Sequence, residues 1–585
     1  MTSGLKLPIV LGVTGHRDLR EKDIPILQKK VSLIFSELEI LYPHSSFILL
    51  SALAEGADRL VAKEALKRGI VVNAPLPLPI DEYIKDFTSE QSQNEFLDIL
   101  SKCAQSFVVN NLDKEEKNEL RDYAYQRSNI YIALHSQILI ALWDGVENNK
   151  VGGSAEMIRF KSEGIPQKYL KQKKLLSFEE KGLVYIITTP RLQNTRLMKE
   201  PFLVTQKKSF NNKLYLETYR NLDSINKDIE KFYPQIIDQK LNNIVQNEPD
   251  LSDKLNYHNK NLFNFYIISD FLATIYKKKY LFSLQLLFLF IPLGIILFEF
   301  YNELISFIVD YMDVSVEVAG LISKQIEILS IAGYLMVICC IAFLIFKSKR
   351  KEYHRKYLDY RALAEGLRVQ CYWDIACINE EVSDHYLLKQ SSELDWIKYA
   401  IRTVSSTTSI TKEGQEYDKK RFDFIKSFWI DNQKAFFNAK YKADSKNNYR
   451  FRFYTNWLLG ISIVNILFMM VLALSNMPFF NLENPINSET HWRLIPIFFM
   501  TLLLALVASI EGYSEKRLFR EQSNQYRKML EIFENAAMHF SKYLQERTSE
   551  NKLEELILEI GKEALNENAD WVVMHRSRPI EFKIG

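Results

Sequence analysis

The chain has few cysteines, little net charge and no hydrophobic leader, and each absence excludes a class of protein. Five cysteines among 585 residues follow no regular spacing, so they predict neither a disulfide framework nor a metal-binding box. The formal net charge of +3 gives no case for a nucleic-acid-binding protein. Residues 1–7 lack the apolar core of a signal peptide, so we expect the first domain to stay in the cytoplasm.

The hydrophobic residues that are present, 47% of the chain, are gathered into runs. Within the first 190 residues the runs are short and alternate with amphipathic stretches, a pattern typical of an α/β Rossmann-like, doubly wound parallel sheet. The predicted strands are Pro8–Val13, Phe47–Ser51, Val71–Ala74, Phe107–Val109, Ile138–Trp143 and Val184–Thr188. The predicted helices are Ile24–Leu41, Ala57–Arg68, Asp122–Ser136 and Ser154–Ser162.

Three of the predicted strands end in loops of glycine, small and polar residues. The carboxyl ends of parallel strands meet at one edge of a sheet, where ligands bind. We therefore expect one ligand site. Its candidate residues are Gly12, Thr14, Gly15, His16 and Arg17 after the first strand, Ala54, Glu55, Gly56 and Asp58 after the second, and Asp144, Gly152, Gly153, Ser154 and Glu156 after the fifth.

The chemistry of these loops favours a nucleotide and no metal. A helix start preceded by Gly152 and Gly153 offers free N–H groups to a phosphate, and Ser154 adds a hydroxyl donor. Arg17 could hold a phosphate through two hydrogen bonds, and Glu156 could accept hydrogen bonds from ribose hydroxyls. His16 could contact a base, and Asp144 a ribose.

Each loop also has a purely structural explanation. The two glycines could form a turn before a helix, and Asp58 could cap a helix N-terminus. His16 could belong to a surface turn, together with Thr14 and Arg17, and Asp144 could merely end its strand. Three such loops at one edge of one sheet favour a site.

Beyond the α/β region, the residues from 201 to 256 are polar and predict a helical linker. Four uncharged or nearly uncharged apolar runs follow, each long enough to cross a bilayer. They are residues 281–300, 328–346, 457–474 and 494–510. No charged residue lies at mid-membrane, so the spans predict no ion relay.

The charges that flank these runs predict their orientation. Basic residues precede the first and third runs and follow the second and fourth, whereas the two connecting loops are mainly acidic. The positive-inside rule then places both termini in the cytoplasm, with two short hairpins outside.

The two hairpins resemble an internal repeat. The segment Tyr360-Arg361-Ala362-Leu363-Ala364-Glu365 follows the second run, and Tyr526-Arg527-Lys528-Met529-Leu530-Glu531 follows the fourth. An aromatic amphipathic helix precedes each hairpin. The predicted domains are an α/β domain (1–200), the linker (201–256) and two membrane domains (257–400 and 401–585).

The three loop motifs resemble those of the SLOG superfamily, a Rossmann-like group that contains the Smf/DprA proteins and the LOG nucleoside-monophosphate phosphoribohydrolases. The hairpins are similar to SLATT domains, which occur fused to or encoded beside SLOG domains in bacterial conflict systems. The resemblance implies a nucleotide-binding domain that controls a membrane effector in antiphage defence. It also implies a neighbouring enzyme that makes the signal.

The chain departs from the LOG hydrolases at one motif. Val151 stands where their Pro-Gly-Gly motif has proline, and the spacing from Gly153 to Glu156 is shorter than theirs. This disfavours an enzyme, because a catalytic acid must be placed within about half an ångström. Three hypotheses therefore remain open: a sensor of a nucleotide-derived second messenger that permeabilises the membrane, a hydrolase with Glu156 as its acid, and a scaffold with a degenerate pocket.

The sensor hypothesis makes further claims. It expects a multi-pass protein of the bacterial inner membrane that uses no cofactor beyond its nucleotide-derived ligand. A pore built from such plain spans would require a homo-oligomer.

Overall fold

The computed structural model describes residues 5–87, 89–109, 121–170, 181–193, 200–207, 212–236, 257–299, 301, 316–385, 395–406, 419–475, 494–545 and 550–578. The chain divides into two compact units. The α/β unit comprises residues 1–271, 362–416 and 564–569, and the helical unit comprises residues 272–361, 417–563 and 570–585.

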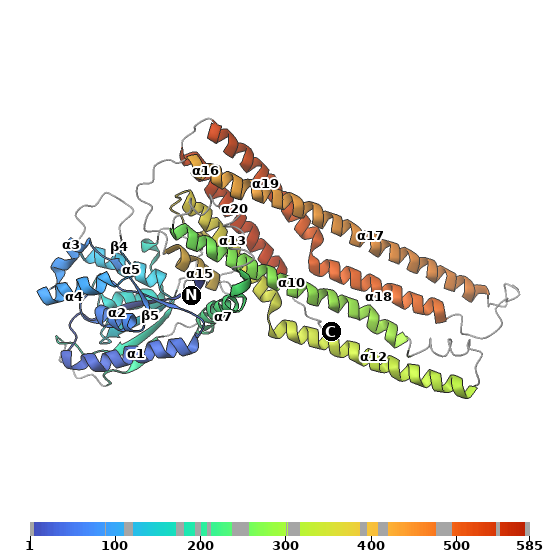
Figure 1. Ribbon diagram of the computed structural model, residues 1–585, viewed down its shortest axis with the longest axis horizontal. Coiled ribbons are helices and arrows are strands. Elements are labelled where there is room, and N and C mark those ends of the chain that lie inside the picture. Colours follow the sequence, from blue (N-terminus) through green and yellow to red (C-terminus); the bar gives the residue numbers. More distant parts are fainter. Residues whose placement is uncertain are drawn as a thin grey trace. The chain divides into compact units, whose positions relative to one another are not determined.

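The α/β unit is built on a seven-stranded sheet with the order β4-β3-β2-β1-β5-β6-β7 (Figure 1). Strands β1 to β6 are parallel, and β7 pairs with β6 in the antiparallel direction. This confirms the predicted α/β class. The strands are β1 (Ile9–Gly15), β2 (Phe47–Leu50), β3 (Val71–Leu76), β4 (Gln105–Val108), β5 (Ile138–Trp143), β6 (Leu183–Thr188) and β7 (Val204–Lys207).

Helices of the α/β unit connect the strands and cover them. All six residues of β5 are buried, and Met157 of α6 packs in the core cluster that contains Trp143. A strand buried on both faces reads as a continuous apolar run, which is why Ile138–Trp143 was predictable to the residue. The helices are α1 (Ile24–Leu41), α2 (Ala57–Lys67), α3 (Ile80–Tyr83), α4 (Glu90–Ser101), α5 (Arg121–His135), α6 (Ser154–Glu163), α7 (Asn212–Ile236), α14 (Val382–His385) and α15 (Asp395–Ser406).

The region predicted as a linker contributes to the sheet unit. Strand β7 extends the sheet beyond residue 200, and the four residues of this strand are too few and too polar to give a periodic signal. Helix α7 lies within the region that was expected to be helical. The side-chain amide of its Asn226 forms two hydrogen bonds, each of 2.8–2.9 Å, with the backbone of Leu7. The hydroxyl of Tyr219 donates to the carbonyl of Gln137 at 2.9 Å. Residues 237–256 lie outside the described part.

Segments that follow the first hairpin also belong to the α/β unit. The buried side chain of Gln137 donates to the hydroxyl of Thr403 in α15 at 3.1 Å. Asn568 lies within hydrogen-bonding distance, 3.5 Å, of the carbonyl of Ala362. The predicted domain boundary at residue 400 falls inside α15, whereas the structure keeps the whole of this helix in the α/β unit.

The helical unit contains most of the residues of four helices long and apolar enough to cross a membrane. They are α10 (Tyr257–Glu299), α12 (Val316–Arg350), α17 (Asn432–Ser475) and α18 (Leu494–Arg517). Only 11–22% of the most apolar 18-residue stretch in each helix is buried inside the protein, which leaves most of these side chains available to lipid. Of the acidic residues predicted in the connecting loops, Glu317 and Glu327 belong to α12. The others, Glu303, Asp310, Asp313, Glu483 and Glu489, lie outside the described residues.

Further helices of this unit follow or pack against these four. Helix α17 packs against α18 and against α19 (Figure 1). The remaining elements with residues in this unit are α13 (Tyr353–Ile375), α16 (Lys419–Ile425), a π-helix (Lys426–Asp431), α19 (Phe519–Gln545) and α20 (Glu550–Arg576). The chain passes between the two units within α10, α13 and α20.

The predicted repeat has a structural counterpart in the aromatic packing of the two hairpins. Tyr360 meets Tyr276 of α10 with ring centroids 5.6 Å apart. Tyr526 meets Phe437 of α17 with ring centroids 5.9 Å apart. In both cases the tyrosine after a hairpin contacts an aromatic ring on the helix that enters that hairpin.

Candidate functional site

The candidate site lies where the strand order reverses. Strands β1 to β4 follow one another outward, and the chain then returns to place β5 on the other side of β1. Loops that leave β1 and β5 at their carboxyl ends diverge, and such a switch point is where open α/β sheets bind ligands. The predicted residues Gly15, His16 and Asp144 lie at this point.

The loop after β1 is fixed by backbone contacts that require glycine. The N–H of His16 donates to the carbonyl of Leu142 at 3.1 Å, and the N–H of Ala57 donates to the carbonyl of His16 at 3.0 Å. A Cβ on Gly15 would lie 2.4 Å from that of Ala57. Gly56 has a φ of +76°, and a Cβ there would lie 2.4 Å from the carbonyl oxygen of Arg17. Both positions therefore exclude side chains.

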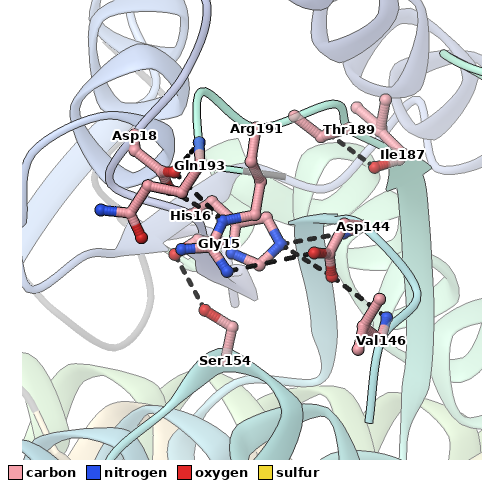
Figure 2. Close-up of polar contacts among 10 residues, drawn as sticks. All are labelled: Gly15, His16, Asp18, Asp144, Val146, Ser154, Ile187, Thr189, Arg191 and Gln193. Atoms are coloured by element: carbon pink, nitrogen blue, oxygen red, sulfur yellow. Dashed lines mark hydrogen bonds and ion pairs between the residues drawn. The ribbon is translucent and has the colours of Figure 1, made fainter. Parts of the chain in front are cut away.

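His16 and Asp144 form the centre of the site (Figure 2). The backbone N–H of Asp144 donates to Nε2 of His16 at 2.9 Å, and Oδ1 of Asp144 lies 3.1 Å from the same nitrogen. Burial lowers the pKa of His16, although the Asp144 carboxylate acts in the opposite direction. The Nε2 atom of His16 therefore contacts both the backbone N–H and the carboxylate of Asp144, and burial favours the neutral form of the ring.

Two further residues of the centre, Arg191 and Asp18, were missed by sequence reasoning. Nε of Arg191 donates to Oδ1 of Asp18 at 2.9 Å, and Nη1 of Arg191 lies 4.0 Å from Oδ2 of Asp144 (Figure 2). The N–H of Gln193 also donates to Asp18 at 3.2 Å. Because Arg191 follows the predicted strand that ends at Thr188, its place after the next strand along the edge was the available signal.

The third predicted loop reaches the centre through Ser154. The Ser154 hydroxyl donates to the carbonyl of Gly15 at 2.8 Å, as Figure 2 shows. Gly153 is the N-cap of α6, with a φ of −87°, and its carbonyl accepts from the N–H of Met157 at 3.2 Å. The N-terminus of α6 therefore lies beside the loop after β1. The N–H groups predicted to be free for a phosphate are engaged within the protein, because Gly152 donates to Glu156 at 2.8 Å and Gly153 donates to the carbonyl of Lys150 at 3.2 Å. The helix dipole still favours an anion at this end of α6.

Glu156 has a structural role in this arrangement. Its Oε1 accepts from Nε2 of Gln126 at 2.7 Å, and its Oε2 accepts from the N–H of Gly152 at 2.8 Å. The residue is 8% exposed. Glu156 thus ties the start of α6 to α5, in the manner of a carboxylate that caps the first turn of a helix.

The second predicted loop is also held by its own polar side chains. Glu55 accepts a hydrogen bond from the Ser92 hydroxyl. The buried guanidinium of Arg59 donates to the carbonyl of Leu53 at 3.1 Å and to Glu95 at 2.9 Å. These bonds order the loop, which forms a wall beside the loop after β1.

Asp58 is the buried carboxyl group of this wall. It accepts a backbone hydrogen bond from Ala54, which holds the turn before α2. Burial raises the pKa of Asp58 to about 7, and the hydrogen bond from Ala54 and the charges of Arg17 and Arg59 counteract this effect only in part. Asp58 therefore holds a proton more tightly than an exposed aspartate does.

The other predicted residues divide between the core and the surface. Gly12 lies against Ile132 of α5, and Thr14 is a buried residue of β1, paired with Ala141 of β5. Arg17 is exposed, with its guanidinium carbon 4.8 Å from the ring centroid of Tyr125. Arg17 is therefore a cation at the surface, beside the switch point.

The arrangement brings together a neutral histidine, two carboxylates, an arginine and a helix N-terminus. It can bind a ligand that combines an anionic group with hydroxyl or ring hydrogen-bonding groups. Within the described residues, no group of three or more His, Cys, Asp or Glu side chains could hold a metal ion.

Fold and site together define a class: a doubly wound α/β domain with a switch-point site, in one chain with four membrane-length helices. Scans of protein-family models, of curated proteins and of solved structures each found no match to this chain.

Proposed function

We propose that this protein is a membrane effector whose α/β unit binds a nucleotide-derived second messenger. The observation that carries the proposal is the meeting of Ser154 and the α6 N-terminus with Gly15, His16 and Asp144 at the switch point. The helix N-terminus suits a phosphate, and the imidazole and carboxylate suit a base and a ribose.

The composition of the α/β unit supports the proposed topology. It gathers chain from before the first hairpin, from between the hairpins and from residues 564–569 after the second. Pieces that pack in one unit must lie on one side of a membrane, so each hairpin crosses the bilayer twice and returns. The basic residues at these ends favour the cytoplasmic side of a bacterial inner membrane, with both termini cytoplasmic.

Ligand binding would act by shifting the equilibrium between two arrangements of several copies of the chain. A ligand shifts such an equilibrium only through its different affinities for the two states, and a near-complete switch needs about 5.5 kcal/mol. The spans themselves are plain, so the proposed output is permeabilisation of the membrane by a homo-oligomer, with antiphage defence as its role.

Binding is favoured over hydrolysis by the position of Glu156. Both of its carboxylate oxygens accept hydrogen bonds within the protein, which leaves it poorly placed to protonate a leaving group. The hydrolase hypothesis predicts turnover of free nucleotides, whereas the sensor hypothesis predicts saturable binding without product. A scaffold with a degenerate pocket predicts neither.

The test is calorimetric titration of the full chain, reconstituted in lipid nanodiscs, with a panel of nucleotides and cyclic oligonucleotides. The isolated fragment 1–200 is unsuitable because it lacks β7, α7 and α15. Gly153→Glu should abolish binding, since it adds a carboxylate at the N-cap of α6, where the backbone φ of −87° accepts a side chain. Gln91→Glu, which adds the same charge in the first turn of α4, should bind as the parent does.

The same pair of variants tests the effector role in cells. The parent and Gln91→Glu should arrest growth and collapse the membrane potential, followed with a voltage-sensitive dye, only when the signal is made. Gly153→Glu should do neither at equal membrane levels. Arrest with an intact potential and a depleted nucleotide pool would reject the effector and favour the hydrolase.

A further inference from the structure

A second charged cluster lies in the helical unit, outside the switch-point site. Four basic side chains from four helices gather there: Lys277 (α10), Arg361 (α13), Lys440 (α17) and Arg517 (α18). Three of them, Lys277, Lys440 and Arg517, act on the carboxylate of Asp444 (α17). Asp444 is buried, and the four basic residues are each partly buried. Lys440 is an electrostatic neighbour of the other three cations as well as of Asp444.

Aromatic rings hold these cations in place. The guanidinium of Arg361 and the ammonium of Lys440 lie 6.0 and 5.7 Å from the ring centroid of Phe436. Arg517 lies 4.8 Å from the ring centroid of Phe519 and donates to the hydroxyl of Tyr513 at 3.2 Å. A ring positions a cation without cancelling its charge, so these contacts leave the positive field of the cluster intact.

The positive-inside bias explains only part of this cluster. Lys277 and Arg517 are close in sequence to the apolar runs of α10 and α18, where that bias places basic residues. Arg361 and Lys440 are several helical turns from the nearest apolar runs, which end at Phe346 and begin at Trp457. Folding therefore brings four cations from four helices together, an arrangement that attracts an anion.

We propose that Lys277, Arg361, Lys440 and Arg517 form a binding site for a phosphate group. Arginines bind phosphate oxygens in pairs and lysines act as point charges, so two of each form a complementary set. Basic pockets between membrane helices near the interface bind the phosphates of lipid headgroups. A free phosphate compound offers the same chemistry, and the experiment separates the two sources.

The experiment measures how fast an amine-reactive acylating reagent modifies Lys440 in the full chain, read by peptide mass spectrometry. The chain is reconstituted in nanodiscs of phosphatidylcholine alone, of phosphatidylcholine with phosphatidylglycerol, or of phosphatidylcholine with added pyrophosphate. Lys446 is the internal reference, because it is exposed on the same helix and nearer the apolar run. General screening by a charged surface would protect Lys446 at least as much as Lys440.

If phosphatidylglycerol slows the acylation of Lys440 relative to Lys446 several-fold and pyrophosphate does not, the cluster is a site for a lipid headgroup. The same protection by pyrophosphate would identify a site open to free phosphates. No protection of Lys440, or equal protection of Lys446, would overturn the proposal.

Variants test whether the cluster acts as one site. Arg517→Ala should remove most of the protection, Arg517→Lys should keep it in part, and Arg520→Ala should leave it unchanged, because the exposed Arg520 takes no part in the cluster. Asp444→Asn removes the opposing charge and should increase protection at a given probe concentration. If Arg517→Ala and Arg520→Ala have equal effects, the proposal is wrong, whatever the outcome for the switch-point ligand.

Discussion

Glu352 and Leu518 occupy the same place in the two hairpins, and both have left-handed backbone conformations, with φ of 51° and 55°. Each lies between a membrane-length helix and the helix that follows it: α12 and α13 for Glu352, α18 and α19 for Leu518. Tyr360 follows Glu352 by eight positions, and Tyr526 follows Leu518 by the same eight positions. The repeat therefore extends to a matched break in the backbone where each hairpin ends.

The two breaks should respond in opposite ways to glycine. Glycine removes the cost of a left-handed conformation, about 1 kcal/mol. The Glu352 side chain is 42% exposed and pairs only with Arg355 among the described ion pairs, so Glu352→Gly should stabilise the fold by about that amount. Leu518 is 1% exposed, and loss of a buried leucine costs more, so Leu518→Gly should destabilise by about 2–4 kcal/mol.

Thermal unfolding of the reconstituted chain measures both effects. Glu352→Ala is the control, since it removes the exposed ion pair but keeps the strained backbone. It should change stability by less than about 0.5 kcal/mol. A Glu352→Gly variant no more stable than Glu352→Ala would show that the break carries no strain.

Removal of Arg191 should raise the pKa of His16. The charge of Arg191 lowers that pKa and the charge of Asp144 raises it, so Arg191→Ala and Asp144→Asn should move it in opposite directions. Histidine hydrogen–deuterium exchange, followed by mass spectrometry of the full chain, reports the pKa at this position. A His16 pKa that stays fixed in both variants would mean that the three side chains do not form one electrostatic unit.

Asp58 should make the α/β unit more stable in mild acid than at alkaline pH. Its pKa is about 7 in the fold against an ordinary value of 3.8, so the folded state holds the proton more tightly. The stability that protonated Asp58 contributes is therefore complete below its ordinary pKa, and this contribution is lost as the pH rises through about 7. Asp58→Asn keeps an acceptor for Ala54 without the charge and should remove this dependence.

The measurement is the melting temperature of parent and variant at about pH 5 and about pH 8, on either side of the folded-state pKa. The variant should melt above the parent at the higher pH, and the difference should shrink at the lower pH. A constant difference between parent and variant at the two pH values contradicts an elevated pKa.

Cysteine labelling checks the topology. In a version without the native cysteines, Asp313→Cys and Asn487→Cys should react with an impermeant thiol reagent added to intact spheroplasts. Ser3→Cys should react only after the cells are broken. Labelling of Ser3→Cys with protection of Asp313→Cys would mean an inverted protein.

The parts predicted from the sequence are those that local pattern determines. The apolar runs of β1 and β5 and the start of α6 at Ser154 follow from burial on both faces and from glycine before a helix. Strand β7 gave no signal because it is a short edge strand whose pairing depends on β6. The roles of Glu156 and Glu55 were not predictable, since Gln126 and Ser92 are distant in sequence.

The α/β unit contains chain from before and after each hairpin. It therefore cannot finish folding until the ribosome has made the last of these segments. Strands β1 to β7 emerge first, but Thr403, the partner of Gln137, follows the first hairpin, and Asn568 follows the second. Synthesis of both hairpins therefore precedes the last steps of folding. A chain truncated before α15 would lack the partner of the Gln137 amide and would open the surface under α15 to solvent, so premature termination yields an incomplete domain that quality-control proteases should recognise.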